Sequence, residues 1–294
     1  MKSKYLIPTI FAVISVFTVS CGKKSDKNKN SDEFLEAQSQ LSKEIKDLAY
    51  RVPPPSEIPY LLQATGADFN HSLINDKNKA DSYISESDRL AINLGVYTAD
   101  IGYLSSYEKA QELIDYLNVC KKMADKIGVS NSFDKDLLDK FEANISNKDT
   151  LASLLNAAVK KTDQFLKEGS RSQLGALVVT GGFVESLYIA TGIVKTYPKN
   201  MIPDDARNAI LTPLMQVIIN QKQSVSQVVQ MLSDVDQEGL VPDFLASIKD
   251  LEASYQKLDI SQKIKDNKGS LALSDKTLVD ITEKIEKLRS KIVL

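Results

Sequence analysis

Apolar residues recur every three or four positions along almost the whole chain, and alternating runs of β-branched residues are missing. This spacing places apolar side chains on one face of a helix, whereas a half-buried strand needs a period of two. Only 12 glycines and 9 prolines interrupt the 294 residues, so the periodic stretches are long. The sequence therefore predicts an all-α fold, a multi-helix bundle of about nine helices.

Turn-forming residues mark the ends of several expected helices. Helices are expected over Ser87–Ser105 and Tyr107–Ile127, and Gly128 follows the second in the position favoured for a left-handed cap. The most apolar helix, Ser172–Tyr197, ends at a proline. The last helix, Ser274–Val293, carries an aliphatic stripe that is typical of a face turned toward a core.

Two of the expected helices are apolar on all sides. Leu90–Tyr107 has Asp100 as its only charge, and Leu174–Val194 has only Glu185. Such a helix is either buried or spans a membrane. For Leu174–Val194, ten strongly apolar residues contribute roughly −3 to −6 kcal/mol to insertion, and a central carboxylate opposes this by roughly 3 kcal/mol. Its glycines and hydroxyl residues bring the sum close to zero, which favours a central core helix.

The same two helices share a glycine pattern. Gly95 and Gly102 are seven residues apart, as are Gly175 and Gly182, so each pair lies on one helical face. A glycine inside a helix is less favourable than alanine by about 1 kcal/mol. Four such positions indicate that helix backbones approach closely there.

Each of these helices also places a tyrosine three residues after its acid. Asp100 precedes Tyr103, and Glu185 precedes Tyr188, so each hydroxyl is expected to hydrogen-bond its carboxylate. One interpretation is a polar pocket in which the two acids lie close together and bind a cation or polar ligand, lined by both tyrosines and Tyr97. The other is structural, because a buried carboxylate must be paired or hydrogen-bonded, here to a helix N-terminus or a basic side chain.

Motifs for most enzyme classes are missing. The chain has one histidine, His71, which is expected in a surface turn before a polar loop over Asn75–Asp81. No cluster has zinc-ligand spacing, and neither a nucleophile elbow nor a P-loop is present. Cys120 lies between apolar residues and is interpreted as a small buried hydrophobe. These observations count against hydrolases, kinases and zinc enzymes, and no metal or cofactor is expected.

The N-terminus has the composition of a targeting segment. Lys2 and Lys4 form a positive region, and the apolar run Tyr5–Val19 follows. This run is shorter than the roughly 20 residues that a helix needs to span a bilayer. The small residue Ser20 precedes Cys21, and the whole segment resembles a bacterial lipoprotein signal peptide that is cut before the cysteine.

That resemblance implies a lipid anchor, including palmitate, on Cys21. Thr18 stands where such signals usually carry leucine, so an ordinary secretory peptide that releases a soluble protein stays an alternative. We therefore divide the chain into a signal peptide (1–20), a lipidated cysteine and flexible tether (21–31), and a single helical domain (32–294). Glycine at position 22, directly after the cysteine, is what lipoproteins sorted to the outer membrane usually show. The sequence does not say which membrane leaflet holds the anchor.

The composition of the tether and the net charge of the chain limit which classes of partner are expected. Residues 22–32 contain no apolar side chain and therefore cannot bury surface that would offset the entropy of ordering. Without Lys2 and Lys4 the chain keeps 37 − 2 = 35 basic residues against 39 acidic ones, a net charge of −4. This balance offers no footprint for nucleic acid.

Three stretches look familiar together: Asn93–Tyr103, Gly181–Ala190 and Asn220–Ser224. They resemble an uncharacterised family of all-helical envelope lipoproteins from Gram-negative bacteria. The resemblance implies an all-helical fold and a location in the cell envelope, and it adds nothing about activity. The sequence thus predicts a membrane-anchored envelope lipoprotein that binds a protein partner or small ligand without catalysis. The alternatives are a purely structural lipoprotein and a carboxylate-based enzyme that uses Asp100 and Glu185.

Overall fold

The computed structural model describes part of the chain. It covers residues 67–129, 135–144, 171–197, 217–258 and 276–294, together with 147, 150, 151, 153, 154, 157, 158, 160, 161, 164, 211, 214 and 215. The chain divides into two compact units, Met1–Asp47 and Leu48–Leu294, and every described residue belongs to the second. The expected signal peptide, Cys21 and the tether lie outside the described residues.

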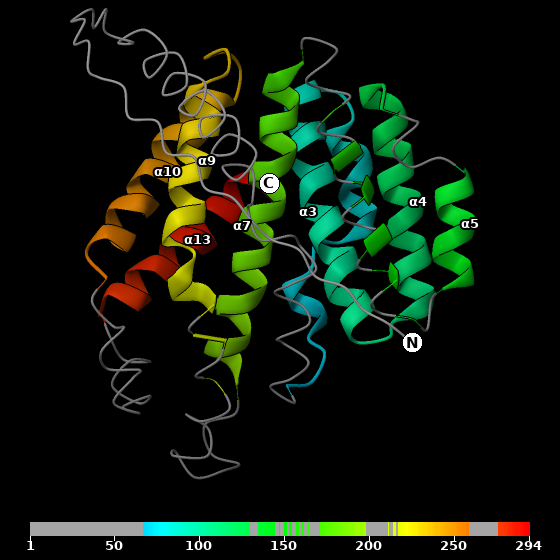
Figure 1. Ribbon diagram of the computed structural model, residues 1–294, viewed down its shortest axis with the longest axis horizontal. Coiled ribbons are helices and arrows are strands. Elements are labelled where there is room, and N and C mark those ends of the chain that lie inside the picture. The colour runs from blue at the N-terminus through cyan, green and yellow to red at the C-terminus, as the bar shows by residue number, and fades with distance from the viewer. Residues whose placement is uncertain are drawn as a thin grey trace, which may run out of the picture. The chain divides into compact units, whose positions relative to one another are not determined.

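The described residues form helices and no strand (Figure 1), which confirms the predicted all-α bundle. Their bounds lie within a few residues of the expected helix ends wherever both are known. The elements are two 3-10 helices, η1 (His71–Leu73) and η2 (Lys77–Tyr83), and the α-helices α3 (Ser87–Ser106), α4 (Ala110–Ile127), α5 (Lys135–Ala143), α7 (Ser172–Thr196), α9 (Lys222–Ser233), α10 (Val241–Gln256) and α13 (Lys276–Val293).

Helices α3 and α7 pack directly against each other, backbone to backbone. A Cβ atom added to Gly95 would lie 2.0 Å from the carbonyl oxygen of Val178, and one added to Gly181 would lie 1.9 Å from that of Ile92. At Gly182 the nearest atom would be the carbonyl oxygen of Gly95, 3.3 Å away. The close approach expected at Gly95 and Gly182 is confirmed, and Gly181 shares in it.

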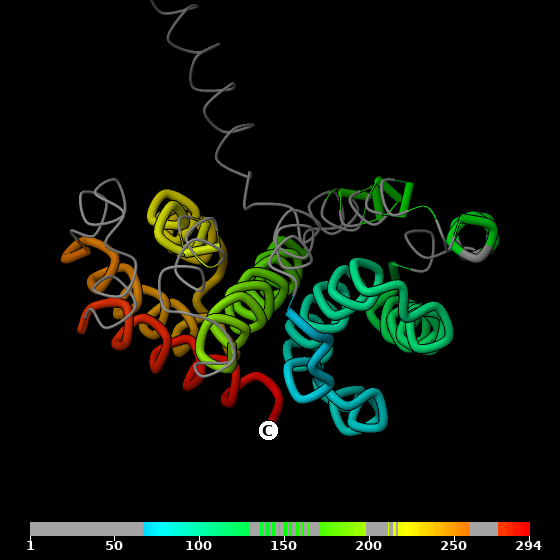
Figure 2. Tube along the Cα trace, turned by 90° about the horizontal axis from the view of Figure 1, so that it is seen from below, coloured from blue at the N-terminus to red at the C-terminus, as the bar shows by residue number. Residues whose placement is uncertain are grey.

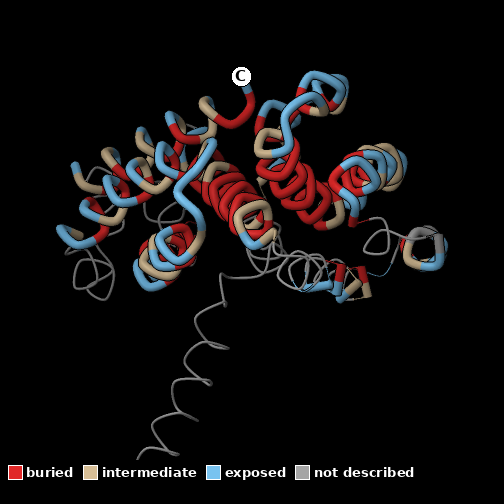
Figure 3. Tube along the Cα trace, turned by 90° about the horizontal axis from the view of Figure 1, so that it is seen from above, coloured by how far each residue is buried: buried red, intermediate tan, exposed pale blue. Residues whose placement is uncertain are grey.

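Helices on both sides cover this pair (Figure 2). Helix α4 and η2 pack on α3, whereas α9 and α13 pack on α7 and α10 joins them. Helix α13 also contacts α3. The central pair is consequently buried almost all round, as the red tubes in Figure 3 show.

Among the described residues, one helix is long and apolar enough to cross a membrane, and it is α7. Its most apolar window is 83% buried inside the protein. The surfaces that would face lipid in a single span are thus covered by α3, α9 and α13. This packing agrees with the expected role of α7 as a core helix.

One expectation about local structure is wrong. The segment Asn75–Asp81, expected as a polar loop, leads into the 3-10 helix η2. The side chain of Asp76 caps this helix by accepting a hydrogen bond from the amide of Asn78. Ala80 and Tyr83 are buried and attach it to the bundle. Burial of these two side chains therefore stabilises a helix in a segment whose composition is mostly polar.

The end of α13 is fixed by polar side chains from η2 and α3. The carbonyl of Val293 accepts hydrogen bonds from Lys79 Nζ and from the hydroxyl of Tyr83, each at 3.1 Å. The carbonyl of Ile292 accepts one from Asn93 Nδ2 at 3.0 Å. These bonds satisfy carbonyls that a helix end leaves unpaired, and they hold the last turns of α13 against the central pair.

Candidate functional site

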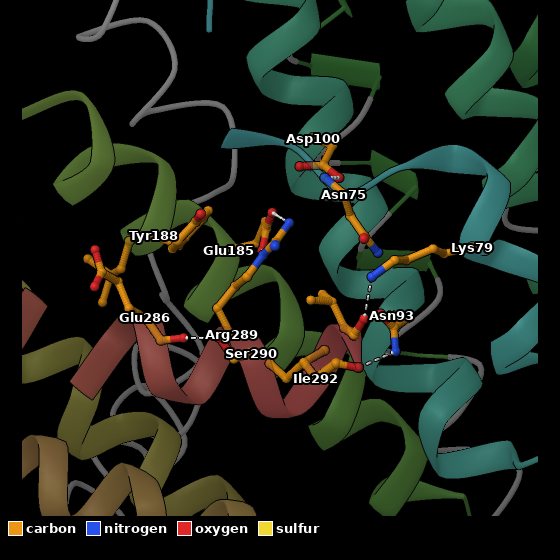
Figure 4. Close-up of polar contacts among 12 residues, drawn as sticks. Asn75, Lys79, Asn93, Asp100, Glu185, Tyr188, Glu286, Arg289, Ser290 and Ile292 are labelled. Carbon is orange, nitrogen blue, oxygen red and sulfur yellow. Dashed lines mark hydrogen bonds and ion pairs between the residues drawn. The ribbon is translucent and has the colours of Figure 1, made fainter. Parts of the chain in front are cut away.

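The two isolated acids meet in the interior. Asp100 on α3 and Glu185 on α7 are both 0% exposed, and they lie close enough for the charge of Glu185 to raise the pKa of Asp100. Figure 4 shows the two side chains approaching each other from neighbouring helices. The expectation that the acids lie close together inside the protein is confirmed.

Arg289 on α13 neutralises one of the acids. Its Nε donates to Glu185 Oε2 at 3.1 Å, and its Nη2 donates to Oε1 at 3.2 Å. The arginine side chain is only 14% exposed. A two-pronged pair of this kind fixes orientation as well as charge, so Glu185 holds α13 in register with α7.

The second acid is bound by the backbone. The amide of Asn75 donates to Asp100 Oδ2 at 3.1 Å, whereas Asp100 Oδ1 receives no hydrogen bond from the described residues. The carbonyl of Asn75 accepts a bond of 2.6 Å from the hydroxyl of Tyr116 on α4. Asp100 Oδ1 is therefore a buried oxygen without a donor among the described residues.

Burial and neighbouring charges affect the pKa values of the two acids differently. Burial, and next the neighbouring Glu185 carboxylate, raise the pKa of Asp100 well above its ordinary value. Burial also raises the pKa of Glu185, but the guanidinium of Arg289 opposes that rise. Glu185, paired with Arg289, is therefore the more favourable place for the negative charge, and Asp100 is the more favourable place for a proton. The cluster is then neutral, which avoids the several kcal/mol of burying an unpaired ion.

Tyr103 does not bind Asp100, so that prediction is wrong. The hydroxyl of Tyr103 accepts a hydrogen bond from the amide of Asn70 at 3.0 Å. Its ring stacks on Phe69 with 5.2 Å between ring centroids. This stacking directs the hydroxyl to the chain segment before η2 and away from the acid.

Tyr188 does not hydrogen-bond Glu185 in the structure either. Its ring lies under the guanidinium of Arg289, 4.6 Å from the ring centroid, in a cation–π contact. Tyr97 is fully buried, and its hydroxyl donates to the carbonyl of Asp76 at 2.8 Å. The three tyrosines therefore bind backbone and arginine and do not bind the carboxylates.

Sequence reasoning missed the two groups that satisfy the acids. Arg289 belongs to a helix whose aliphatic stripe suggested only core packing, and Asn75 to an expected loop. One signal was present: Arg289 is the only arginine in a helix that otherwise uses lysine, and it follows Ile285 by four residues. Arginine is the preferred cation for buried pairs, so this choice marks the residue.

Two further residues behave as expected. Cys120 is buried and carries no disulfide, and burial raises the pKa of its thiol. His71 is exposed at the start of η1, with Nε2 3.3 Å from an oxygen of Glu112. Neither belongs to the acid pair.

Two grooves on the described surface contain no predicted site residue. One, of about 220 Å³, lies between α10 and α13. The other, of about 530 Å³, lies between the start of α9 and the end of α10. The first is lined by Ala246, Ser247, Asp250, Lys284, Lys287, Leu288 and Lys291. No group of three or more metal-ligating residues occurs in the described part of the chain.

Comparison of this chain with protein families, with curated proteins and with solved structures finds no match.

The arrangement at Asp100 and Glu185 can hold a proton and join three helices. A general acid or base must come within hydrogen-bond reach of its substrate, but both carboxyl groups are fully buried. Both oxygens of Glu185 are occupied by Arg289. The geometry therefore favours the structural interpretation of the acids.

Proposed function

We propose that this protein is a lipoprotein of the bacterial outer membrane, anchored through lipid on Cys21, whose helical unit binds a partner without catalysing a reaction. The anchor rests on the positive N-terminus, the short apolar run and the small residue before Cys21. Several acyl chains give stable anchoring, since each buried CH₂ contributes about 0.8 kcal/mol.

The observation that carries the non-catalytic part is the closure of the acid pair. Asp100 and Glu185 are the only charges within the central stretches of two otherwise apolar helices, and both are 0% exposed. Arg289 pairs with Glu185, and Asn75 binds Asp100. The acids thus hold α3, α7 and α13 together, and binding of a partner falls to the outer surface of the bundle.

Intact-mass analysis of the membrane fraction tests the anchor. The full-length protein should appear as an acylated chain that begins at Cys21, and Cys21→Ser should lose both processing and acylation. Cys120→Ser is the matched control, because this second cysteine is buried in the bundle and should leave acylation unchanged. Recovery of Cys21→Ser in the processed, membrane-bound form would overturn the anchor.

A shortened chain that starts at Ser31 tests whether α7 is a core helix. It lacks Cys21 and should remain in solution without detergent, because α7 is covered by its neighbours. If this chain stays detergent-dependent, α7 is not satisfied by the bundle and the assignment of a single N-terminal anchor is wrong.

Calcium titration of the full protein and of Glu185→Gln tests the structural role of the acids. We expect no heat of binding that depends on Glu185. The variant should unfold more easily by about 1–3 kcal/mol, because Arg289 loses its charged partner. Calcium binding by the wild type that Glu185→Gln abolishes would show that the acids form a ligand site.

A further inference from the structure

A short segment lies against Asp100, and its hydrogen bonds cross to two helices. We call Asn70–Asp76 the strap. Its amides donate at two points, from Asn70 to the hydroxyl of Tyr103 at 3.0 Å and from Asn75 to Asp100 Oδ2 at 3.1 Å. Both acceptors are side chains of α3, so these two amides are bound by side chains and not by a helix ladder.

The strap also accepts hydrogen bonds from two tyrosines. Tyr116 donates to the carbonyl of Asn75 at 2.6 Å, and Tyr97 donates to the carbonyl of Asp76 at 2.8 Å. Leu73 and Ile74 are 4% and 6% exposed and cover the apolar side. These donors are neutral hydroxyls. Of the hydrogen bonds that the backbone of the strap makes to α3 and α4, the one to Asp100 ends on an acid, and at the surface the side chain of His71 also lies 3.3 Å from Glu112.

The groups that face Asp100 decide its charge in the closed state. Glu185 brings one negative charge and Arg289 one positive charge. Burial raises the pKa of the phenols and of the thiol near Asp100, so these groups stay neutral. A single cation thus serves two carboxyl groups. The neighbours are Glu185 of α7, Arg289 of α13, Tyr97 of α3, and Tyr116 and Cys120 of α4.

We propose that the strap is a proton-operated clasp, which closes over the acid pair when Asp100 binds a proton and opens when that proton leaves. Without the proton, two carboxylates would share one guanidinium in a closed interior, since Asp100 Oδ1 has no donor among the described residues. Lifting the strap removes the Asn75 amide and admits water to Asp100. Only the open state brings the acids into contact with solvent.

The direction of the pH dependence follows from proton linkage. In the open state Asp100 titrates near its ordinary pKa of about 4, whereas burial raises its pKa in the closed state. Below the ordinary value both states are protonated, so closure is fully favoured. Between the two pKa values closing takes up one proton, so the opening constant rises about tenfold per pH unit. The clasp does not depend on the lipid anchor.

Hydrogen exchange at the Asn75 amide of the full-length protein tests the clasp. Its protection factor, which divides out the chemical exchange rate, should fall about tenfold per pH unit over part of the range from about pH 5 to about pH 9. Asp100→Asn keeps an acceptor for this amide but cannot ionise, so its profile should be flat. A flat wild-type profile, or the same slope in Asp100→Asn, would overturn the proposal.

Two controls separate strap opening from general unfolding. The amide of Leu251 on α10 should keep a flat protection factor, and equal slopes at Asn75 and Leu251 would overturn the clasp even if Asp100→Asn fails to fold.

Tyr116→Phe removes one bond to the strap, so exchange at Asn75 should rise at every pH with the same slope. Tyr255→Phe is its match, because this buried hydroxyl bonds the carbonyl of Ile218 and should leave Asn75 unchanged.

Discussion

The crossing of α3 and α7 and the contact of α10 with α13 are both buried, but they are built in opposite ways. At the crossing, Gly95 and Gly181 let one backbone rest on the other, and the interior holds two acids. Helices α10 and α13 contact each other beside a groove of about 220 Å³, and each contributes buried aliphatic side chains to the core, such as Ile248 and Ile285. The outer faces there carry exposed lysine–aspartate pairs.

This difference shows which changes each interface tolerates. At the crossing, an added atom has no room because the nearest atoms are backbone. Between α10 and α13, a removed atom leaves a cavity because side chains supply the packing. Arg289 links the two regions, since α13 packs on α10 and also carries the cation that neutralises Glu185.

Removal of this cation should have the largest effect. Arg289→Met keeps an apolar stem but leaves the Glu185 charge buried and unpaired, so we expect a loss of about 3–5 kcal/mol at neutral pH. The loss should shrink as the pH falls through the pKa of Glu185, because the neutral acid needs no cation. Chemical denaturation at several pH values measures it.

Lys291→Met is the matched control for the arginine. It lies on the same helix and pairs with Asp243 at 3.0 Å, but its side chain is 35% exposed. An exposed pair contributes about 0–1 kcal/mol. Equal losses for the two variants would show that burial of the Glu185 pair is not what matters.

An added methyl group at the crossing should have the next largest effect. In Gly95→Ala the new Cβ would lie 2.0 Å from one backbone atom and 2.7 Å from another, so the helices must separate, with a loss of about 3 kcal/mol. Gly182→Ala is the control, since its Cβ would lie 3.3 Å from the nearest atom. Alanine there also gains about 1 kcal/mol of helix propensity, which offsets the tight contact. Similar melting temperatures for both variants would contradict the backbone contact.

Removal of a single carbon group from α13 should have the smallest effect of the three. Ile285→Val deletes one buried methylene from α13, and we expect a loss of about 1 kcal/mol. Denaturant unfolding at constant pH measures it. A loss as large as that of Gly95→Ala would mean that the α10–α13 contact is packed as rigidly as the crossing.

Periodicity was sufficient to predict most of the fold. The expected helices over 87–105, 172–197 and 274–293 match α3, α7 and α13 within two residues. Gly128 ends α4 in the left-handed conformation, as expected. The 3-10 helix η2 could not be predicted from its polar composition, because burial of Tyr83 against other helices fixes it.

Only one part of the site could be predicted from the sequence: a single charged residue in an otherwise apolar helix indicates a buried charge. Asp100 and Glu185 stood out because each lies in an apolar helix, and glycines indicated that these helices cross. Arg289 lies 104 residues from Glu185, and the amide of Asn75 lies 25 residues from Asp100. Such partners depend on which helices become neighbours, and local spacing does not contain this information.

The central claim is that Asp100 carries a proton while Glu185 keeps its charge beside Arg289. Carbon NMR titration of the Asp100 and Glu185 carboxyl groups tests it most directly. Asp100 should remain protonated at neutral pH while Glu185 is ionised, and Glu185→Gln should lower the pKa of Asp100 because the neighbouring negative charge is removed. Titration of Asp100 near its ordinary pKa of about 4, unchanged in Glu185→Gln, would contradict the shared proton.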